Sequence, residues 1–163
     1  MKIDNIKLLT EYERQFKRKY PGLGCKLITM HNSCRLDFDV LVDGKIINSY
    51  TADGILVCTP TGSTAYNLSC GGPIVDPTAK ILTLTPIAPH TVINRSIVLS
   101  DDSTVEIRIT EIRDNTTSFV LYDGHPIEVF NGDVIKIKKS DKLTKIIKLE
   151  DTSFIDTIRE NIN

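Results

Sequence analysis

Short apolar stretches, separated by clusters of Gly, Asp and Asn, run along most of the chain. Stretches of about four to eight apolar, β-branched or alternating residues between turn residues are typical of β-strands. They predict strands at 26–30, 36–42, 45–51, 55–58, 81–85, 96–99, 104–110, 117–122, 127–130, 134–138 and 145–149. Many short strands at this spacing predict a mainly β protein that folds as an antiparallel β-sandwich.

The clearest turn signal is Asp43-Gly44, which lies between two of these strands. Residues 36–42 mostly alternate apolar and acidic side chains, which predicts a strand with one buried face. Asp-Gly between two such strands favours a tight hairpin turn. We therefore expect residues 45–51 to return alongside residues 36–42.

The two ends of the chain have different patterns. Apolar residues recur every four positions from Leu8 to Tyr20, which predicts an amphipathic helix over residues 3–19 that Pro21-Gly22 ends. Residues 152–163 fit either a polar helix or a frayed end. The predicted organisation is an N-terminal helix over 1–22, a β domain over 23–150 and a C-terminal tail over 151–163.

Composition narrows the class of protein. A chain of 163 residues is expected to form one domain, and 40% hydrophobic with 25% charged residues is typical of a folded chain. The net charge of −1 gives no basic field for nucleic acid, and Trp, which stacks on bases, does not occur. We find neither an apolar run long enough to cross a membrane nor a secretory segment at the N-terminus. We therefore expect neither nucleic acid nor a membrane as a partner.

The four cysteines and three histidines do not have metal-ligand spacing, and no Cys-x-x-Cys pair occurs. The sequence around these residues supports no Ser-His-Asp or Cys-His nucleophile. We assign no catalytic residue and no metal ligand, and we expect a cytoplasmic, reduced, metal-free protein.

Residues 53–73, DGILVCTPTGSTAYNLSCGGP, combine a strand, a polar turn and a short helix. The apolar run 55–58 predicts a buried strand, and 59–64 is a turn rich in hydroxyl groups. Residues 64–70 predict about two turns of helix, which Gly71-Gly72 ends. A strand that turns into a helix in this way directs backbone N–H groups toward one point, which suits an anion or a sugar hydroxyl.

The polar side chains of this stretch allow two interpretations. In one, Thr61, Ser63 and Thr64 add hydrogen-bonding groups to a ligand site, and the Asp53 carboxylate binds ribose hydroxyls. In the other, the hydroxyls cap the helix and Asp53 lies in a turn. Spacing alone leaves both open, because the stretch is neither a Walker loop nor a dinucleotide fingerprint.

The same stretch resembles the central signature of the NAD kinase family, whose members phosphorylate NAD to NADP. Residues 84–99, with LTPIAPH followed by NR and IVL, agree with the family as well. Asp123-Gly124-His125 lies where the family carries an Asp-Gly-Gln or similar turn. The resemblance covers about two-thirds of the chain, from Arg35 to Ile137 in the family's order.

The resemblance implies which residues bind the dinucleotide. Asp53 would hold ribose or amide groups, Tyr66 would offer an aromatic face to a base, and Ala88 would form a pocket wall that a larger side chain would crowd. The implied substrate-binding residues are Asp53, Thr61, Thr64, Ala65, Tyr66, Ser69, Ala88, Asn32 and His125. Asn32 stands for an Asn-Asp or Asn-Glu pair of the family, whose acidic member has no counterpart here. We interpret His90 as a structural residue.

The family also carries a Gly-Gly-Asp-Gly motif, whose Asp is the presumed base and whose backbone holds the ATP phosphates. No Gly-Gly-Asp occurs in this sequence, so the resemblance is to the carboxy-terminal β domain of the family. A natural truncation, half of a split gene and an excised piece all remain open. The resemblance implies NAD and NADP as substrate and product, with ATP and Mg²⁺ needed by the full enzyme.

The expected function is therefore that of an NAD kinase, with this chain supplying the NAD-binding and oligomerising domain and inactive alone. Its expected partners are copies of itself, as a dimer or tetramer, and a separate Gly-Gly-Asp-Gly domain. The alternative is a non-catalytic dinucleotide-binding or assembly module that works with a separate catalytic chain. A distant lipid-kinase relative would share the fold, but the intact TPTGSTAY run disfavours it.

Overall fold

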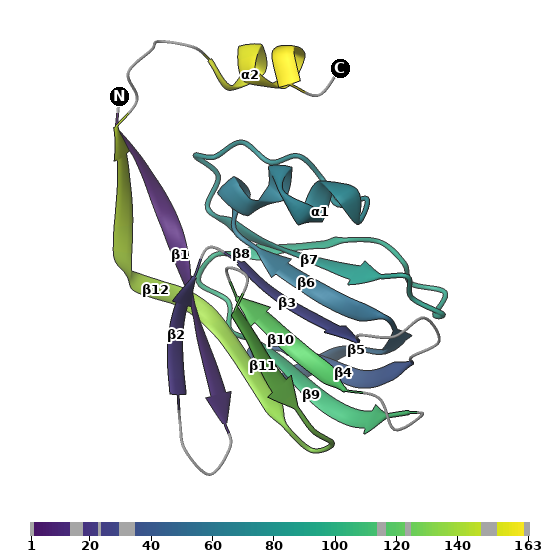
Figure 1. The fold of residues 1–163 in the computed structure, drawn as a ribbon. Helices are drawn as coiled ribbons and strands as arrows, with labels where there is room; N and C mark the ends of the chain where they lie inside the picture. Colours follow the sequence, from purple (N-terminus) through teal and green to yellow (C-terminus); the bar gives the residue numbers. More distant parts are fainter. Residues whose placement is uncertain are drawn as a thin grey trace.

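Two six-stranded antiparallel sheets stack on each other in the computed structural model (Figure 1). The model describes residues 2–13, 18–22, 24–29, 35–113, 117–122, 125–147 and 153–161. The first sheet has the order β2 (Arg18–Gly22), β1 (Lys2–Glu13), β12 (Val134–Ile147), β9 (Val105–Ile112), β4 (Leu36–Val42) and β5 (Lys45–Ala52). The second has the order β11 (His125–Val129), β10 (Ser118–Tyr122), β3 (Gly24–Thr29), β6 (Gly54–Cys58), β7 (Ile81–Ile87) and β8 (Ile97–Ser100). The predicted mainly β, antiparallel fold is confirmed.

The hydrophobic core lies between the two sheets, because alternate residues of each strand point to the same face. Phe38 and Tyr50 stack across β4 and β5 with ring centroids 5.5 Å apart. The first sheet contributes Leu36, Phe38, Val40, Tyr50, Ala52, Val105, Ile107, Ile109, Ile135 and Ile137, and the second contributes Ile55, Val57, Leu82, Leu84, Val120 and Val129. Each such side chain, when buried, stabilises the fold by about 1.5–3 kcal/mol.

The hairpin between β4 and β5 turns where the sequence predicts it. Asp43 and Gly44 have positive φ angles of 50° and 79°, as a tight hairpin turn requires at both central positions. Asp43 also holds the turn to the residue just before β9, because its Oδ1 accepts a hydrogen bond from the Thr104 amide at 2.8 Å. This prediction is confirmed.

The predicted N-terminal helix is wrong. Residues 2–13 form β1, which pairs with β12 along most of its length and with β2 on its other side. Pro21-Gly22, expected to end the helix, lies in β2. A spacing of four residues is a multiple of the strand period of two, so the apolar pattern is compatible with both structures. Pairing with the long partner β12 then decides between them.

Three short helical segments complete the described part of the chain: η1 (Pro60–Thr64), α1 (Tyr66–Ser69) and α2 (Phe154–Asn161). The hydroxyl-rich turn itself forms η1, and α1 confirms a short helix after it, with four residues in place of the predicted two turns. At the C-terminus, α2 resolves the open alternative in favour of a helix. Ser153 and Asp156 form a capping box at its start, since each side chain bonds the backbone amide of the other at 3.1 Å. Within the described ranges no helix has the length and apolar character needed to cross a bilayer.

Candidate functional site

The turn after β6 begins at a buried strand end. Every residue of β6 is buried, and so are the two that follow, Thr59 and Pro60. Thr59 Oγ1 accepts a hydrogen bond from the Gly62 amide at 3.4 Å, and Pro60 occupies the first position of η1, where its missing N–H costs nothing. The capping interpretation therefore holds for Thr59.

The segment η1–α1 has an inner and an outer face. Ser63 and Asn67 are completely buried on the inner face, which lies against β6 and β7 (Figure 1). The outer face consists of residues that the sequence predicts to bind a ligand: Thr64, Ala65, Tyr66 and Ser69 are exposed, and Thr61 is half-buried. We call these five residues the signature face. The fold thus brings five of the predicted site residues together on one exposed surface.

Asn67 uses its side-chain amide to hold this segment in place. Its Nδ2 donates to the Ser63 carbonyl at 3.2 Å and to the Pro73 carbonyl at 3.0 Å. Its Oδ1 accepts from the Thr85 hydroxyl on β7 at 2.8 Å. Ser96 Oγ lies 2.8 Å from the same Thr85 hydroxyl. A buried hydrogen-bonded chain therefore runs from α1 through the sheet to the residue just before β8.

The glycines after α1 end the helix and make room for that amide. Gly71 has a φ of 75°, and the amides of Gly71 and Gly72 donate to the carbonyls of Leu68 and Asn67, at 3.0 and 2.9 Å. This is a Schellman ending. A Cβ atom on Gly72 would come within 2.1 Å of Asn67 Oδ1, so glycine is required there for a steric reason.

Asp53 and Ala88 form a second group, the corner group, at the opposite end of β6. The Asp53 amide donates to the Ile87 carbonyl at 3.0 Å, which places Asp53 beside Ala88. Ala88 is exposed and has a φ of 44°, a conformation that costs a non-glycine residue about 1–2 kcal/mol. The corner group lies at the start of β6 and the signature face follows its end, with α1 folded back so that Asn67 bonds Thr85, opposite Leu56 in the middle of β6.

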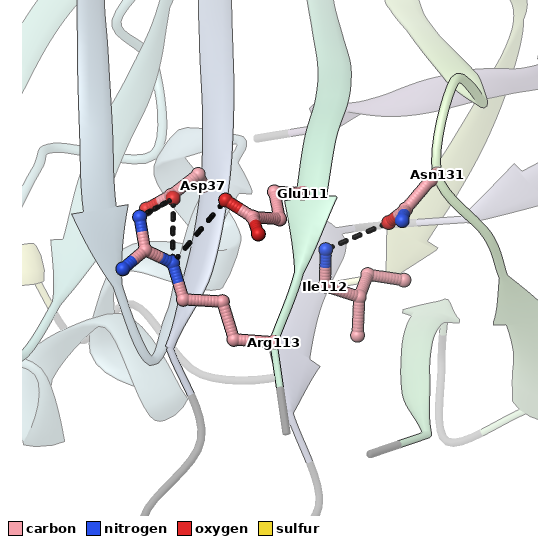
Figure 2. Close-up of polar contacts among 5 residues, drawn as sticks. All are labelled: Asp37, Glu111, Ile112, Arg113 and Asn131. Carbon is pink, nitrogen blue, oxygen red and sulfur yellow. Dashed lines mark hydrogen bonds and ion pairs between the residues drawn. The ribbon is translucent and has the colours of Figure 1, made fainter. Parts of the chain in front are cut away.

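A charged cluster holds the adjoining ends of β4 and β9 (Figure 2). Asp37 lies opposite Thr51 in the sheet and accepts two hydrogen bonds from the Arg113 guanidinium, which also contacts Glu111 at 3.4 Å. Burial alone would raise the pKa of Asp37, but hydrogen bonds from Thr51 and Arg113 and the charge of Arg113 outweigh it and lower that pKa. Beside the cluster, the His90 amide donates to the Thr51 carbonyl at 2.8 Å. The cluster therefore supports the backbone that leads into Asp53.

Figure 2 also shows how a turn between the sheets continues the β9 pairing. Asn131 Oδ1 accepts from the Ile112 amide at 2.7 Å, so the side chain takes the place of a neighbouring strand. The Gly132 amide and the Asp133 carbonyl bond to Ile109 in the same way, each at 2.9 Å. This turn joins β11 of the second sheet to β12 of the first and holds the two sheets together at this point.

Residues 24–149 match the family model of the ATP-NAD kinase C-terminal domain. The chain belongs to the NAD kinase family. It is 45% identical over 143 residues to the NAD kinase of Carboxydothermus hydrogenoformans, which covers 86% of this chain and 50% of that protein. It is 43% identical over 122 residues to the NAD kinase of Caldanaerobacter subterraneus subsp. tengcongensis, which covers 74% of this chain and 42% of that protein. The chain thus spans about half the length of these relatives.

Two solved NAD kinase family structures have the same fold. Yeast NADH kinase complexed with NADH superposes with a TM-score of 0.90 at 25% identity and covers 99% of this chain, which corresponds to 48% of that protein. An NAD kinase from Archaeoglobus fulgidus in complex with ATP superposes with a TM-score of 0.77 at 25% identity, over 91% of this chain and 56% of that protein. The resemblance inferred from the sequence is confirmed.

The two other residues predicted from the NAD kinase resemblance are Asn32 and His125. Asn32 lies outside the described residues. His125 is exposed at the start of β11, with its ring 5.4 Å from that of Tyr122, and β10 and β3 separate it from β6. It lies level with Cys25 and Val57, at the end of the sheet where β6 leads into the turn, and its role in binding stays a prediction.

Titratable groups near the NAD kinase signature are shifted toward their neutral forms. Burial, with a contribution from neighbouring Cys70, raises the pKa of Tyr66. Burial raises the pKa of the Cys58 thiol to about 12, so this cysteine is a small apolar residue rather than a nucleophile. Among the described residues, no three His, Cys, Asp or Glu side chains gather in a way that would hold a metal ion.

Asn67, Thr85 and the Asp37–Arg113 pair are not predicted from the sequence. Asn67 and Thr85 are 18 residues apart, and Asp37 and Arg113 are 76 apart, so no local pattern connects them. The one local signal was Gly-Gly-Pro shortly after Asn67, which leaves space for a polar side chain. An open groove of about 480 Å³ exists elsewhere, lined by Asp102, Thr104, Lys138, Lys139, Ser140 and Asp141, and contains none of the predicted residues.

Proposed function

We propose that this chain supplies the NAD-binding and oligomerising domain of an NAD kinase, an enzyme that phosphorylates NAD to NADP with ATP. The observation that carries the proposal is the signature face, where five residues that match the family signature are gathered on one accessible surface. The inner residues of the same segment are buried and hydrogen-bonded, so they hold the backbone that carries the outer face.

The chemistry of the signature face suits a dinucleotide. Tyr66 is 47% exposed, so its ring is available to stack on a base while its hydroxyl reaches a polar group. Thr61, Thr64 and Ser69 add hydroxyl groups that donate and accept hydrogen bonds with ribose hydroxyls or phosphate oxygens. Ala65 has no side chain beyond Cβ, which lets a ligand approach the backbone.

The corner group extends this proposal to a second copy of the chain. Asp53 and Ala88 lie at the start of β6 and the signature face follows its end, so we propose that a dimer or tetramer brings the corner group of one copy to the signature face of another. The exposed edge strand β5 supports association, because Ile46 and Ile47 are exposed there and none of the strands in the described residues pairs with its outer edge. In this arrangement the Asp53 carboxylate accepts hydrogen bonds from ribose hydroxyls.

Phosphoryl transfer needs a donor held in line with its acceptor. We propose that ATP and Mg²⁺ bind mainly to a Gly-Gly-Asp-Gly domain and that this chain selects and orients NAD. We place the reaction in the cytoplasm, where thiols such as Cys58 and Cys70 stay reduced.

Calorimetric titration of the purified chain with NAD, NADP and ATP, each alone, tests the proposal. We expect NAD or NADP to bind measurably, ATP to bind hardly at all, and NADP formation from NAD and ATP to need an added Gly-Gly-Asp-Gly domain. Enzyme-like turnover by the chain alone would contradict the division of labour. Binding of NAD without turnover in any such mixture would favour the alternative, a non-catalytic dinucleotide-binding module.

A further inference from the structure

The amide of Asn67 has only one arrangement that fits its surroundings. Both Nδ2 hydrogens go to backbone carbonyls, those of Ser63 and Pro73, so Oδ1 must face Thr85 as an acceptor. The Thr85 hydroxyl has a single hydrogen, which it gives to Oδ1, and it can therefore only accept from Ser96. The chain of hydrogen bonds thus has one direction, from Ser96 through Thr85 to Asn67.

The chain of hydrogen bonds from Ser96 through Thr85 to Asn67 links two parts of the molecule that carry predicted site residues. At one end, Asn67 follows Tyr66 directly, and its neighbours Ala65 and Ser69 belong to the signature face. At the other end, Ser96 closes the connection between β7 and β8 that begins at Ala88 of the corner group. Asn67 and Thr85 are almost completely buried, so neither touches a ligand itself.

Burial makes these hydrogen bonds hard to break. In a low-dielectric interior an unpaired polar group is costly, so each member is held strongly to its partner. A second contact also holds this segment in place: Ser63 Oγ accepts a hydrogen bond from the Val75 amide at 3.1 Å, which links η1 to the residues that follow Gly72. By contrast α1 has only four residues, too few to form a stable helix on its own.

We propose that Asn67 is a positioning residue: through Thr85 and Ser96 it holds the signature face in its ligand-binding conformation and ties it to the connection that carries Ala88. The inference rests on the proposed NAD-binding function of the signature face. It assigns to Asn67, Thr85 and Ser96 a role in affinity for the dinucleotide, which a purely structural role in the fold would not give them.

Thr85 offers a matched pair of variants that separates the two roles. Thr85→Val keeps the volume and removes the hydroxyl, whereas Thr85→Ser keeps the hydroxyl and removes a methyl group. If the hydrogen-bonded chain positions the signature face, Thr85→Val weakens NAD binding about tenfold and Thr85→Ser binds as the unchanged chain does. If Thr85 contributes packing alone, the order of NAD affinities reverses. Thr85→Val then binds NAD as the unchanged protein does, and Thr85→Ser binds it more weakly because the lost methyl group leaves a cavity.

NAD affinity is measured by calorimetry well below the melting temperature of each variant, with Ile107→Val as the control. Ile107 lies in the core of the first sheet, so this control lowers stability without touching the chain of hydrogen bonds. Ser96→Ala, which removes only the partly buried end of the chain, is the second variant should Thr85→Val fail to fold. We expect it to weaken NAD binding about threefold, and unchanged affinity in it would overturn the proposal.

The reactivity of the Cys70 thiol gives a readout that needs no ligand. Cys70 is half-buried at the end of α1, so loosening α1 exposes it. We expect Thr85→Val to raise the labelling rate of the Cys70 peptide, followed by mass spectrometry, about tenfold, and Thr85→Ser to leave it unchanged. If the unchanged chain does not bind NAD, the proposed function fails, yet this labelling still decides whether Asn67 positions the signature face. Equal labelling in both variants would overturn the inference.

Discussion

Residues 59–73 include side chains that hold the backbone and side chains that remain accessible, and the sequence alone does not distinguish the two kinds. Ser63 and Asn67 point inward and hold the backbone, while Thr64 and Tyr66 point outward and remain accessible. The capping interpretation holds for Thr59, which caps η1, whereas ligand binding by the outward residues stays a prediction. Thr61 and Thr64 are three residues apart, so the three-residue period of the 3₁₀ turn places them on the same side, which residue type alone does not reveal.

The outward position of Tyr66 leads to a prediction about binding without loss of stability. Tyr66→Ala and Asp53→Ala should each weaken NAD binding by about 1–3 kcal/mol, roughly one to two decades in affinity, because a stacked ring or a charged hydrogen bond is lost. Melting temperatures should change little, because both residues are exposed. Ser63→Ala is the contrasting variant: it removes both bonds to Val75 and should lower the melting temperature. Lower melting temperatures of the Tyr66 and Asp53 variants with unchanged NAD affinity would mean that these residues stabilise the fold and do not bind the ligand.

Gly72 and Asn67 should depend on each other. Gly72→Ala forces a methyl group into the space of the Asn67 amide, so we expect it to destabilise the chain by about 1–3 kcal/mol. In an Asn67→Ala background the amide is gone and the methyl group has room, so the cost of Gly72→Ala should fall. Urea unfolding of the two single variants and the double variant measures this coupling. Additive costs would mean that the amide does not occupy that position.

At the scale of elements, the strands were predictable because their signals are local. Alternation in residues 36–42, the Asp43-Gly44 turn and the apolar run of β6 each indicate the observed structure without knowledge of the rest. The segment 2–13 was not predictable in this way. Its spacing fits a helix as well as a strand, and the decisive partner, β12, lies more than 120 residues away in sequence. For the same reason the buried links from Asn67 to Thr85 and from Asp37 to Arg113 have no local signal.

The junction of β4 and β9 should give the protein a specific loss of stability in acid. The folded-state pKa of Asp37 is lowered, so its ion pair with Arg113 stabilises the fold above the unfolded pKa of about 3.8 and loses that effect as pH falls toward the folded pKa. Arg113→Met should therefore lower the melting temperature at about pH 6, and the difference from the unchanged chain should shrink at about pH 3.

Asp37→Asn is the matched test of the same pair, because it removes the titrating group instead of its partner. The difference in melting temperature between Asp37→Asn and the unchanged protein should likewise shrink from about pH 6 to about pH 3, measured by thermal unfolding at constant ionic strength. A difference that stays constant over this range in both variants would mean that the pair contributes nothing through ionisation of Asp37.

At the scale of the whole molecule, the proposed pairing of the corner group of one copy with the signature face of another predicts an oligomer with shared sites. Light scattering at tens of micromolar should give a mass well above the 18.2 kDa of one chain. Mixing Asp53→Ala with Tyr66→Ala chains tests sharing directly. If each site takes its corner group from one copy and its signature face from another, random exchange in a dimer restores about a quarter of the sites. An 18.2 kDa monomer, or no recovery on mixing, would contradict this arrangement.

The measurement that tests the central proposal most directly is the map of backbone amide NMR signals that shift when NAD is added to the isotope-labelled chain. We expect the largest shifts at Thr61, Thr64, Ala65, Tyr66 and Ser69, with a second set at Asp53 and Ala88, and none of comparable size in the Tyr66→Ala variant. Shifts concentrated in the groove around Asp102 and Lys139, or no saturable shifts at millimolar NAD, would contradict the proposal that the signature face binds the dinucleotide.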